Sequence, residues 1–184
     1  MNTLTDLQEI YSSYDKQKWL IQELRSDHAG ETGAIWIYKG ILATSRDDAI
    51  KAFSQRHLRT EIDHLRLMER LLPTTEHSRL LPVWRIAGFL TGAIPALFGQ
   101  RTVFLTINAV ERFVEEHYQQ QIDRLNDDGL FEVATLLEQC MADEVSHQLE
   151  AASLMGDRKG AFDSFVTWLV SAGSAIAVKC ARLI

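Results

Sequence analysis

The stretches Glu61-Ile62-Asp63-His64 and Glu144-Val145-Ser146-His147 decide the fold of this 184-residue chain. Both have the form Glu-x-x-His, and a further glutamate precedes each of them. Glu31 lies 30 residues before Glu61, and Glu111 lies 33 residues before Glu144. A separation of that length holds most of one helix, a short turn and the entry into a second helix. The repeat therefore predicts two helical hairpins that carry the same polar elements.

Apolar residues recur at helical spacing on both sides of these glutamates, and no strand-like alternation competes with this pattern. We expect helices over residues 15–43, 49–72, 102–125 and 130–155, and a last helix from about residue 162. Short turns join the first two helices and the next two, so the helices of each pair are antiparallel. Residues 73–101 hold all three prolines of the chain and form the long link between the pairs.

These elements predict an all-α fold and a single domain over residues 1–184. The architecture that fits them is a ferritin-like four-helix bundle with one long crossover, plus an additional C-terminal helix. Residues 65–110 include this crossover. Within it, residues 86–100 carry no charge and are broken by Gly88, Gly92, Pro95 and Gly99. Residues 164–178 of the last helix carry no charge either. Both uncharged stretches are shorter than the ~20 apolar residues that a membrane-spanning helix needs.

Two interpretations of the apolar crossover segment remain open. In one, it belongs to the core and covers one end of the bundle. In the other, it lies in the membrane surface and admits a lipid-soluble substrate. Trp84, Phe89 and Phe98, with basic residues nearby in the chain, are typical of a membrane boundary, so we favour the interfacial interpretation.

The repeated glutamates stand in apolar stripes, where a single buried carboxylate costs several kcal/mol or takes up a proton. Two divalent cations would neutralise four carboxylates, and each Glu-x-x-His adds one nitrogen on the same helix face. Carboxylate and imidazole ligands suit iron or manganese better than a structural zinc site. One such motif alone usually marks an exposed face, but two copies favour a di-metal centre. Its predicted ligands are Glu31, Glu61, His64, Glu111, Glu144 and His147.

Other polar residues near these positions have weaker claims. Asp27 and Asp143 are candidates to accept a hydrogen bond from the outer nitrogen of a metal-bound histidine, with an exposed helix acid as the equal alternative. Tyr118 and His117 are candidates for a proton or electron relay, although such side chains more often pack in a core. Glu115 is either an extra ligand or a solvated acid.

Three further histidines have no assigned chemistry at this stage. His28 faces the bundle and is interpreted as a core histidine, whereas His57 and His77 have no evident role.

The composition excludes several classes of function. The net charge of −6, without a basic run, argues against a nucleic-acid partner. Two cysteines far apart in sequence are too few for a disulfide framework and do not form a Cys-x-x-Cys motif. The N-terminus is polar and contains acids, which is unlike a signal or transit peptide. These features favour a reducing cytoplasm.

The residues around the predicted ligands resemble the demethoxyubiquinone hydroxylase family over most of the chain, from about Arg25 to the C-terminus. The segment Arg25-Ser26-Asp27-His28-Ala29-Gly30-Glu31-Thr32-Gly33-Ala34 is similar to the signature of its first helix. Further matches are Glu61-x-x-His64-Leu65, Pro82-x-Trp84-x-x-x-Gly88 with Gly92, Val110-Glu111 with His117-Tyr118, and Asp143-Glu144-x-x-His147. Ser26 and the pair Glu115-Glu116 depart from the family pattern.

The resemblance implies O2-dependent hydroxylation of a demethoxyubiquinone-type polyprenyl quinone ring in ubiquinone biosynthesis. It implies two iron ions held by the six predicted ligands, with Glu61 and Glu144 as bridging carboxylates. Electrons would come from NADH, a reductase or the quinol, because the chain has no dinucleotide-binding glycine motif.

The resemblance also implies a peripheral location on the inner face of the bacterial cell membrane and contacts with partner proteins of the same pathway, and it is compatible with a homo-oligomer. The alternative is a ferritin-like iron-handling or peroxide-reducing protein without a quinone substrate. The apolar crossover segment disfavours that alternative, because an iron-storage protein needs a polar outer surface.

Overall fold

A computed structural model describes the backbone of residues 14–156 and 160–184. All regular structure in this part of the chain is helical, which confirms the all-α prediction. The four long helices of the bundle are α2 (Tyr14–Thr44), α3 (Asp48–Leu71), α5 (Gln100–Asp127) and α6 (Phe131–Met155). Two further helices, α4 (Leu81–Leu97) and α7 (Ala161–Leu183), and the 3₁₀ turn η1 (Thr74–Glu76) complete the fold.

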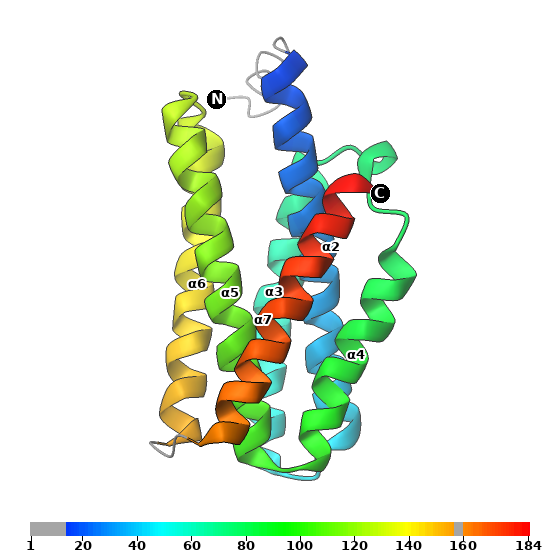
Figure 1. The fold of residues 1–184 in the computed structure, drawn as a ribbon, viewed down its shortest axis with the longest axis vertical. Helices are drawn as coiled ribbons and strands as arrows, with labels where there is room; N and C mark the ends of the chain where they lie inside the picture. The colour runs from blue at the N-terminus through cyan, green and yellow to red at the C-terminus, as the bar shows by residue number, and fades with distance from the viewer. Residues whose placement is uncertain (1–13, 157–159) are drawn as a thin grey trace.

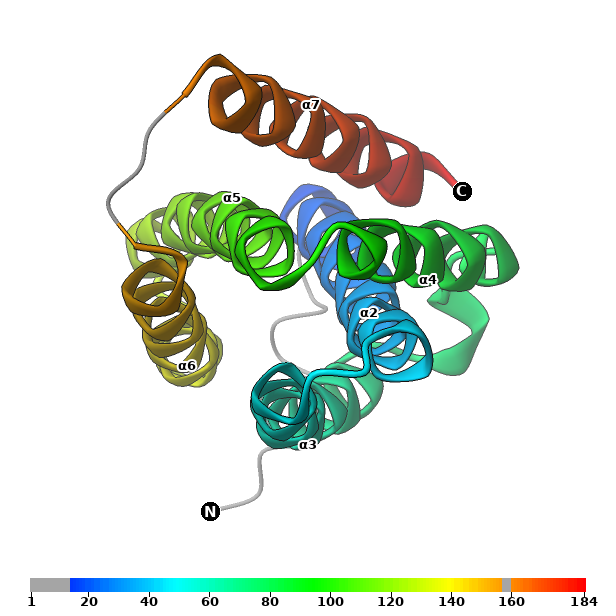
Figure 2. The ribbon, with the colours of Figure 1, turned by 90° about the horizontal axis from the view of Figure 1, so that it is seen from below.

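The helices form a bundle of four with two helices added on one side. Figure 2, a view along the bundle, shows α3 and α6 on one side, and α4 and α7 flanking α2 and α5 on the other. The α2–α3 and α5–α6 hairpins pack closely, whereas α3 and α6 meet over far fewer residues. This is the ferritin-like arrangement with a C-terminal helix that the repeat predicted.

The boundaries of α3 follow local rules that were visible in the sequence. Asp47 caps its N-terminus, since its carboxylate accepts hydrogen bonds from the amides of Ala49 at 2.8 Å and Ile50 at 3.2 Å. At the other end, Leu72 leaves the helical conformation directly before Pro73.

The crossover differs from the broken segment that its glycines and proline suggested. Residues 81–97 form one helix, α4, which continues through Gly88 and Gly92 and contains Pro95 in its last turn. The glycines let its backbone contact α2 directly. A Cβ atom on Gly92 would lie 1.9 Å from the carbonyl oxygen of Ile37, and one on Gly88 would lie 2.3 Å from that of Gly33. These glycines therefore serve close helix packing and do not break the helix.

The C-terminal helix lies along the outside of α2 and α5 (Figure 1). Among the described residues, α7 is the one helix long and apolar enough to cross a membrane, judged by length and composition alone. Its 23 residues exceed the uncharged stretch seen in the sequence because the helix continues past Lys179. Trp168 is 64% exposed, so α7 presents apolar side chains outward as well as toward the bundle.

Two apolar clusters fill the bundle, one toward each end. The first joins all four long helices around Leu24, Met68, Leu125 and Leu137. The second also draws on all four and is centred on Phe53, Phe104 and Ile107. The predicted metal ligands belong to neither cluster, and they form the polar layer described next.

Candidate metal centre

The structure brings the six predicted ligands together in the interior of the bundle. They come from all four long helices, and none of the six is more than 5% exposed. Their donor atoms form two overlapping sets, each with every atom within 4.8 Å of the others. One set is Glu31, Glu61, His64 and Glu144, and the other is Glu61, Glu111, Glu144 and His147. Glu61 and Glu144 belong to both sets, which is the position expected of bridging carboxylates.

The donor atoms of these sets face one another without forming regular hydrogen bonds. His64 Nδ1 lies 2.9 Å from one oxygen of Glu144, and His147 Nδ1 lies 3.2 Å from the other. Both nitrogens and both of these oxygens nevertheless lack an aligned hydrogen-bond partner, as does Glu61 Oε1. Buried polar atoms are nearly always satisfied in folded proteins. A cluster of unsatisfied carboxylate and imidazole atoms therefore fits two cations of the iron or manganese type.

The electrostatics of the cluster without metal favour protonation of most of its acids. Burial raises the pKa of Glu31 to about 7, against the opposing effect of His64. Burial and the neighbouring Glu144 raise the pKa of Glu61 and of Glu111 well above the ordinary range. Burial acts on Glu144 in the same direction, but His147 and His64 outweigh it and lower this pKa to about 2. One carboxylate thus stays charged, while at the neighbouring carboxylates protons compete with metal ions.

The metal-free protein should therefore lose stability as the pH rises from about 5 to 9. The pKa of Glu31 rises from 4.5 to about 7 on folding, so its stabilising protonation is lost across that window. His64 acts in the same direction between pH 6.5 and about 9. Burial lowers its pKa, but Glu144 and Glu31 raise it by more, so that the pKa is about 9 in the folded protein. Thermal melts of chelator-treated protein should show a lower Tm at pH 8.5 than at pH 5.5. Added Mn²⁺ should reverse this trend, since metal binding releases protons; a metal-free Tm that rises with pH would contradict the cluster.

Two buried tyrosines hold carboxylates of the cluster from outside. The hydroxyl of Tyr118 donates to Glu31 Oε1 at 2.6 Å, and that of Tyr38 donates to Glu111 Oε1 at 2.9 Å. Burial raises the pKa of both phenols, so they remain donors. Sequence reasoning singled out Tyr118 and missed Tyr38. Its position two turns after Glu31 was the available signal.

The two predicted supporting aspartates have different surroundings. Asp143 Oδ2 lies 3.2 Å from Nε2 of His64, the side of the ring away from the cluster, as expected for an acid that orients a metal-bound histidine. Asp27 does not take that place, which corrects the expectation for it. It faces α5, where it accepts a hydrogen bond from Gln121 at 2.8 Å and lies 3.3 Å from His117.

His117 belongs to this separate polar network beside the cluster. Its Nε2 lies 3.2 Å from the hydroxyl of Ser26 and 2.9 Å from the amide nitrogen of Gln121. Tyr118 contacts a predicted ligand and His117 does not, so a relay through both residues remains a prediction. Glu115 belongs to neither ligand set, and its neighbour Glu116 is exposed and pairs with Arg112.

The three histidines without assigned chemistry are all engaged. His28 stacks on His77 with 3.9 Å between ring centroids. Burial and this neighbour lower the pKa of His28 to about 4, in keeping with a neutral core histidine. His57 packs against the predicted ligand His147, which sequence reasoning missed.

A largely apolar cavity of about 710 Å³ leads from the cluster to the surface between α4 and α7. It reaches Glu31, Glu61, Glu111 and Glu144 at its inner end. Toward the outside its walls include Trp84, Leu90, Ile94, Phe98, Leu169 and Ile176. Trp84 and Phe98 thus line the route that the sequence suggested for substrate entry. Phe89 does not line this route. Its ring packs edge-on against that of Trp36, with 6.4 Å between ring centroids.

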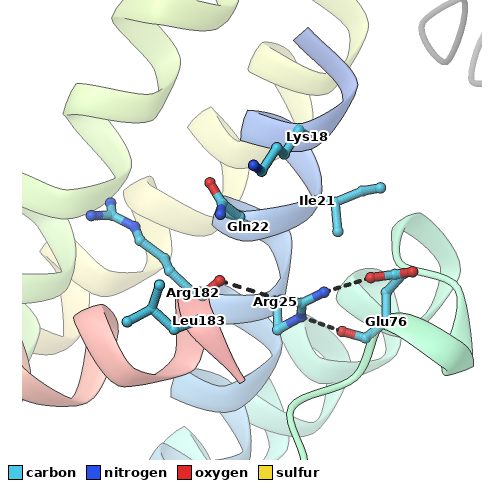
Figure 3. Close-up of a pocket in the computed structure, with 7 residues that line it drawn as sticks. All are labelled: Lys18, Ile21, Gln22, Arg25, Glu76, Arg182 and Leu183. Carbon is cyan, nitrogen blue, oxygen red and sulfur yellow. Dashed lines mark hydrogen bonds and ion pairs between the residues drawn. The ribbon is translucent and has the colours of Figure 1, made fainter. Parts of the chain in front are cut away.

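A second pocket of about 430 Å³, lined mainly by residues with polar or charged side chains, lies where the end of α7 meets α2 and η1 (Figure 3). Arg25 donates to the side chain of Glu76, to its carbonyl oxygen and to the carbonyl oxygen of Arg182. Arg182 in turn donates to Glu23 at 2.7 Å. These contacts fasten the end of α7 to α2 and so help to close one wall of the apolar cavity.

Comparisons with known proteins agree with the site. Residues 18–181 match the family model described as ubiquinone biosynthesis protein COQ7. The chain is 31% identical over 158 residues to the 3-demethoxyubiquinol 3-hydroxylase of Rhodospirillum rubrum, covering 84% of this chain and 74% of that protein.

Two further relatives carry the name NADPH-dependent 3-demethoxyubiquinone 3-hydroxylase, mitochondrial. The chain is 27% identical to that of Caenorhabditis elegans over 179 residues, which cover 95% of each chain. It is 32% identical to that of Homo sapiens over 129 residues, covering 67% of this chain and 59% of the human protein. The chain belongs to the COQ7 family of ubiquinone biosynthesis proteins, as its motifs predicted.

Proposed function

We propose that this protein is a di-iron monooxygenase that hydroxylates the ring of a demethoxyubiquinone-type quinol in ubiquinone biosynthesis. The observation that carries the proposal is that the candidate metal cluster and an apolar cavity adjoin each other. A buried cluster of four glutamates and two histidines lies at the inner end of an apolar cavity that opens between α4 and α7. The names of the relatives supply the substrate class and the type of reaction.

The six clustered residues would hold two iron ions, with Glu61 and Glu144 shared between them. When bound, the iron pair would supply the activation of O2 for insertion of one oxygen atom into a C–H bond of the ring. The second oxygen atom leaves as water, which requires two electrons and two protons. The relatives named as NADPH-dependent suggest a nicotinamide nucleotide as the external donor of those electrons.

The protein itself contributes orientation and exclusion of water. Tyr118 and Tyr38 each fix one carboxylate through a hydroxyl hydrogen bond, and Asp143 fixes the ring of His64. The apolar walls of the cavity accept a polyprenyl tail and keep bulk water from the reacting ring. A ferritin-like iron-handling or peroxide-reducing role would not use such a cavity.

Isotope labelling tests the reaction directly. Purified protein loaded with Fe²⁺, supplied with a short-chain demethoxyubiquinol, a nicotinamide reductant and ¹⁸O2, should yield a product heavier by one ¹⁸O atom. Mass spectrometry would detect it, and omission of iron is the control. Consumption of O2 without a hydroxylated product would instead support iron handling or peroxide chemistry.

We further propose that α4 and α7 contact the inner face of the cell membrane. Both helices expose large apolar side chains, including Leu97 and Phe98 at 72% each and Trp168 at 64%. They flank the cavity, so lipid contact would place its entrance where a quinone is dissolved. Replacing Phe98 and Trp168 by serine should lower binding to anionic phospholipid vesicles in flotation assays. Serine at exposed Leu149 of α6 is the control, and equal binding of both variants would contradict this orientation.

A further inference from the structure

His57 is a buried histidine next to the predicted ligand His147. It lies on α3 one turn before Glu61 and is 5% exposed, although its imidazole has no place in either ligand set. Its ring meets the ring of His147 edge to face, with 4.0 Å between centroids and 79° between planes. His57 is therefore in direct contact with a predicted ligand.

The other side of the His57 ring is anchored to α6. Its Nε2 lies 2.9 Å from Oε2 of Glu150, which follows His147 by one turn on the same helix. A carboxylate only accepts, so the Nε2 of His57 donates. The second oxygen of Glu150 accepts from Arg56, a neighbour of His57 on α3. Glu150 thus joins two adjacent residues of α3 to the helix that carries His147.

Aromatic packing completes the support. The ring of Phe53 lies against the His57 ring with 4.1 Å between centroids. The ring of Tyr38 is stacked on the His57 ring with 5.9 Å between centroids. Tyr38 also donates a hydrogen bond to Glu111. The His57 ring therefore contacts the predicted ligand His147 directly and is connected to Glu111 through Tyr38. Both of these ligands, His147 and Glu111, belong to the second set of four and not to the first.

The location of the contact explains why it matters. The motifs of α3 and α6 supply both shared glutamates, yet these two helices meet over few residues. Side chains must therefore set their separation. In the first ligand set, Asp143 of α6 contacts His64 of α3 and so links the two helices. Next to the second ligand set, the hydrogen bond between His57 of α3 and Glu150 of α6 makes the corresponding link.

We propose that His57, held by Glu150, is a positioning residue that orients His147 and sets the geometry of the second metal position. The proposal deepens the proposed function, on which it rests. Outer partners of metal ligands typically contribute about 10–100-fold in metal affinity. Loss of the His57 ring should thus loosen the second metal position and leave the first nearly unchanged.

Cobalt(II) titration of the metal-free protein tests this without relying on turnover. Wild type should bind two Co²⁺ with visible ligand-field bands. His57→Ala should weaken the second binding step by about 10–100-fold and alter its bands. His57→Phe keeps a ring against His147 and should retain more affinity than His57→Ala. Gln55→Ala changes an exposed residue of the same helix that belongs to neither ligand set, so it is the matched control, with wild-type binding expected.

The outcomes separate the two proposals. If wild type binds no Co²⁺, the metal-centre proposal fails. If wild type binds two Co²⁺ and His57→Ala binds them with the same affinity and spectrum, the positioning role of His57 alone is overturned. Should His57→Ala fail to fold by circular dichroism, Glu150→Ala decides the question, because it releases the same ring from α6. Wild-type binding by Glu150→Ala would then overturn the proposal.

Discussion

Glu144→Ala is expected to abolish hydroxylation while the helical bundle remains folded. Glu144 belongs to both ligand sets, and its two oxygens lie 2.9 Å from His64 Nδ1 and 3.2 Å from His147 Nδ1. Its removal therefore takes a ligand from both predicted metal positions. We expect iron content to fall below one ion per chain. Turnover should drop by more than ~100-fold, since even outer partners of ligands contribute about 10–100-fold.

The folded state should survive this substitution because the cluster is not part of either apolar core. Metal analysis, circular dichroism and the hydroxylation assay on one preparation would check the three expectations together. Ser146→Ala, at a position two residues along α6 that belongs to neither ligand set, is the matched control and should behave as wild type. Two tightly bound irons with full turnover in Glu144→Ala would refute the ligand assignment.

Gly92→Ala is expected to destabilise the fold strongly, although it adds only one methyl group. The added carbon would lie 1.9 Å from the carbonyl oxygen of Ile37, and that neighbour is rigid helix backbone. To accept it, α4 must move away from α2. Overpacking of this kind costs ~1–3 kcal/mol, and a clash with backbone belongs at the upper end. For a chain of this size we expect Tm to fall by about 4–10 °C.

Gly30→Ala provides a control of opposite sign on α2. A Cβ atom there meets nothing within 4 Å, and the residue is helical. Alanine is favoured over glycine inside a helix by ~1 kcal/mol, so this variant should melt slightly higher than wild type. Differential scanning calorimetry of both variants would measure the contrast. A Gly92→Ala protein as stable as wild type would show that α4 does not contact the α2 backbone there.

Much of the metal centre could be predicted from the sequence because helical periodicity is local. Glu61 and His64 share a face at i and i+3, and so do Glu144 and His147, whatever the rest of the chain does. The matching intervals to Glu31 and Glu111 then place a glutamate opposite each motif. The cap at Asp47 and the end of α3 before Pro73 followed from equally local rules.

The parts that were mistaken or missed depend on which helix faces meet. The glycines of the crossover suggest breaks in a helix, since a sequence does not reveal that a second backbone lies against them. Asp27 was a candidate partner of a ligand histidine, with an exposed acid as the alternative, but the rotation of α2 directs it to Gln121. His57 appeared to have no role because its partners are on α6, about 90 residues away.

By itself, the sequence determined the helical class, the two hairpins and the residues of the predicted ligand cluster, since each depends on spacing within one helix or one turn. Only the tertiary structure decided the cavity between α4 and α7, the tyrosines that donate to Glu31 and Glu111, and the contact of His57 with His147. Those features arise from the relative rotation and separation of helices distant in sequence. They are set by packing across the whole bundle, which no local pattern records.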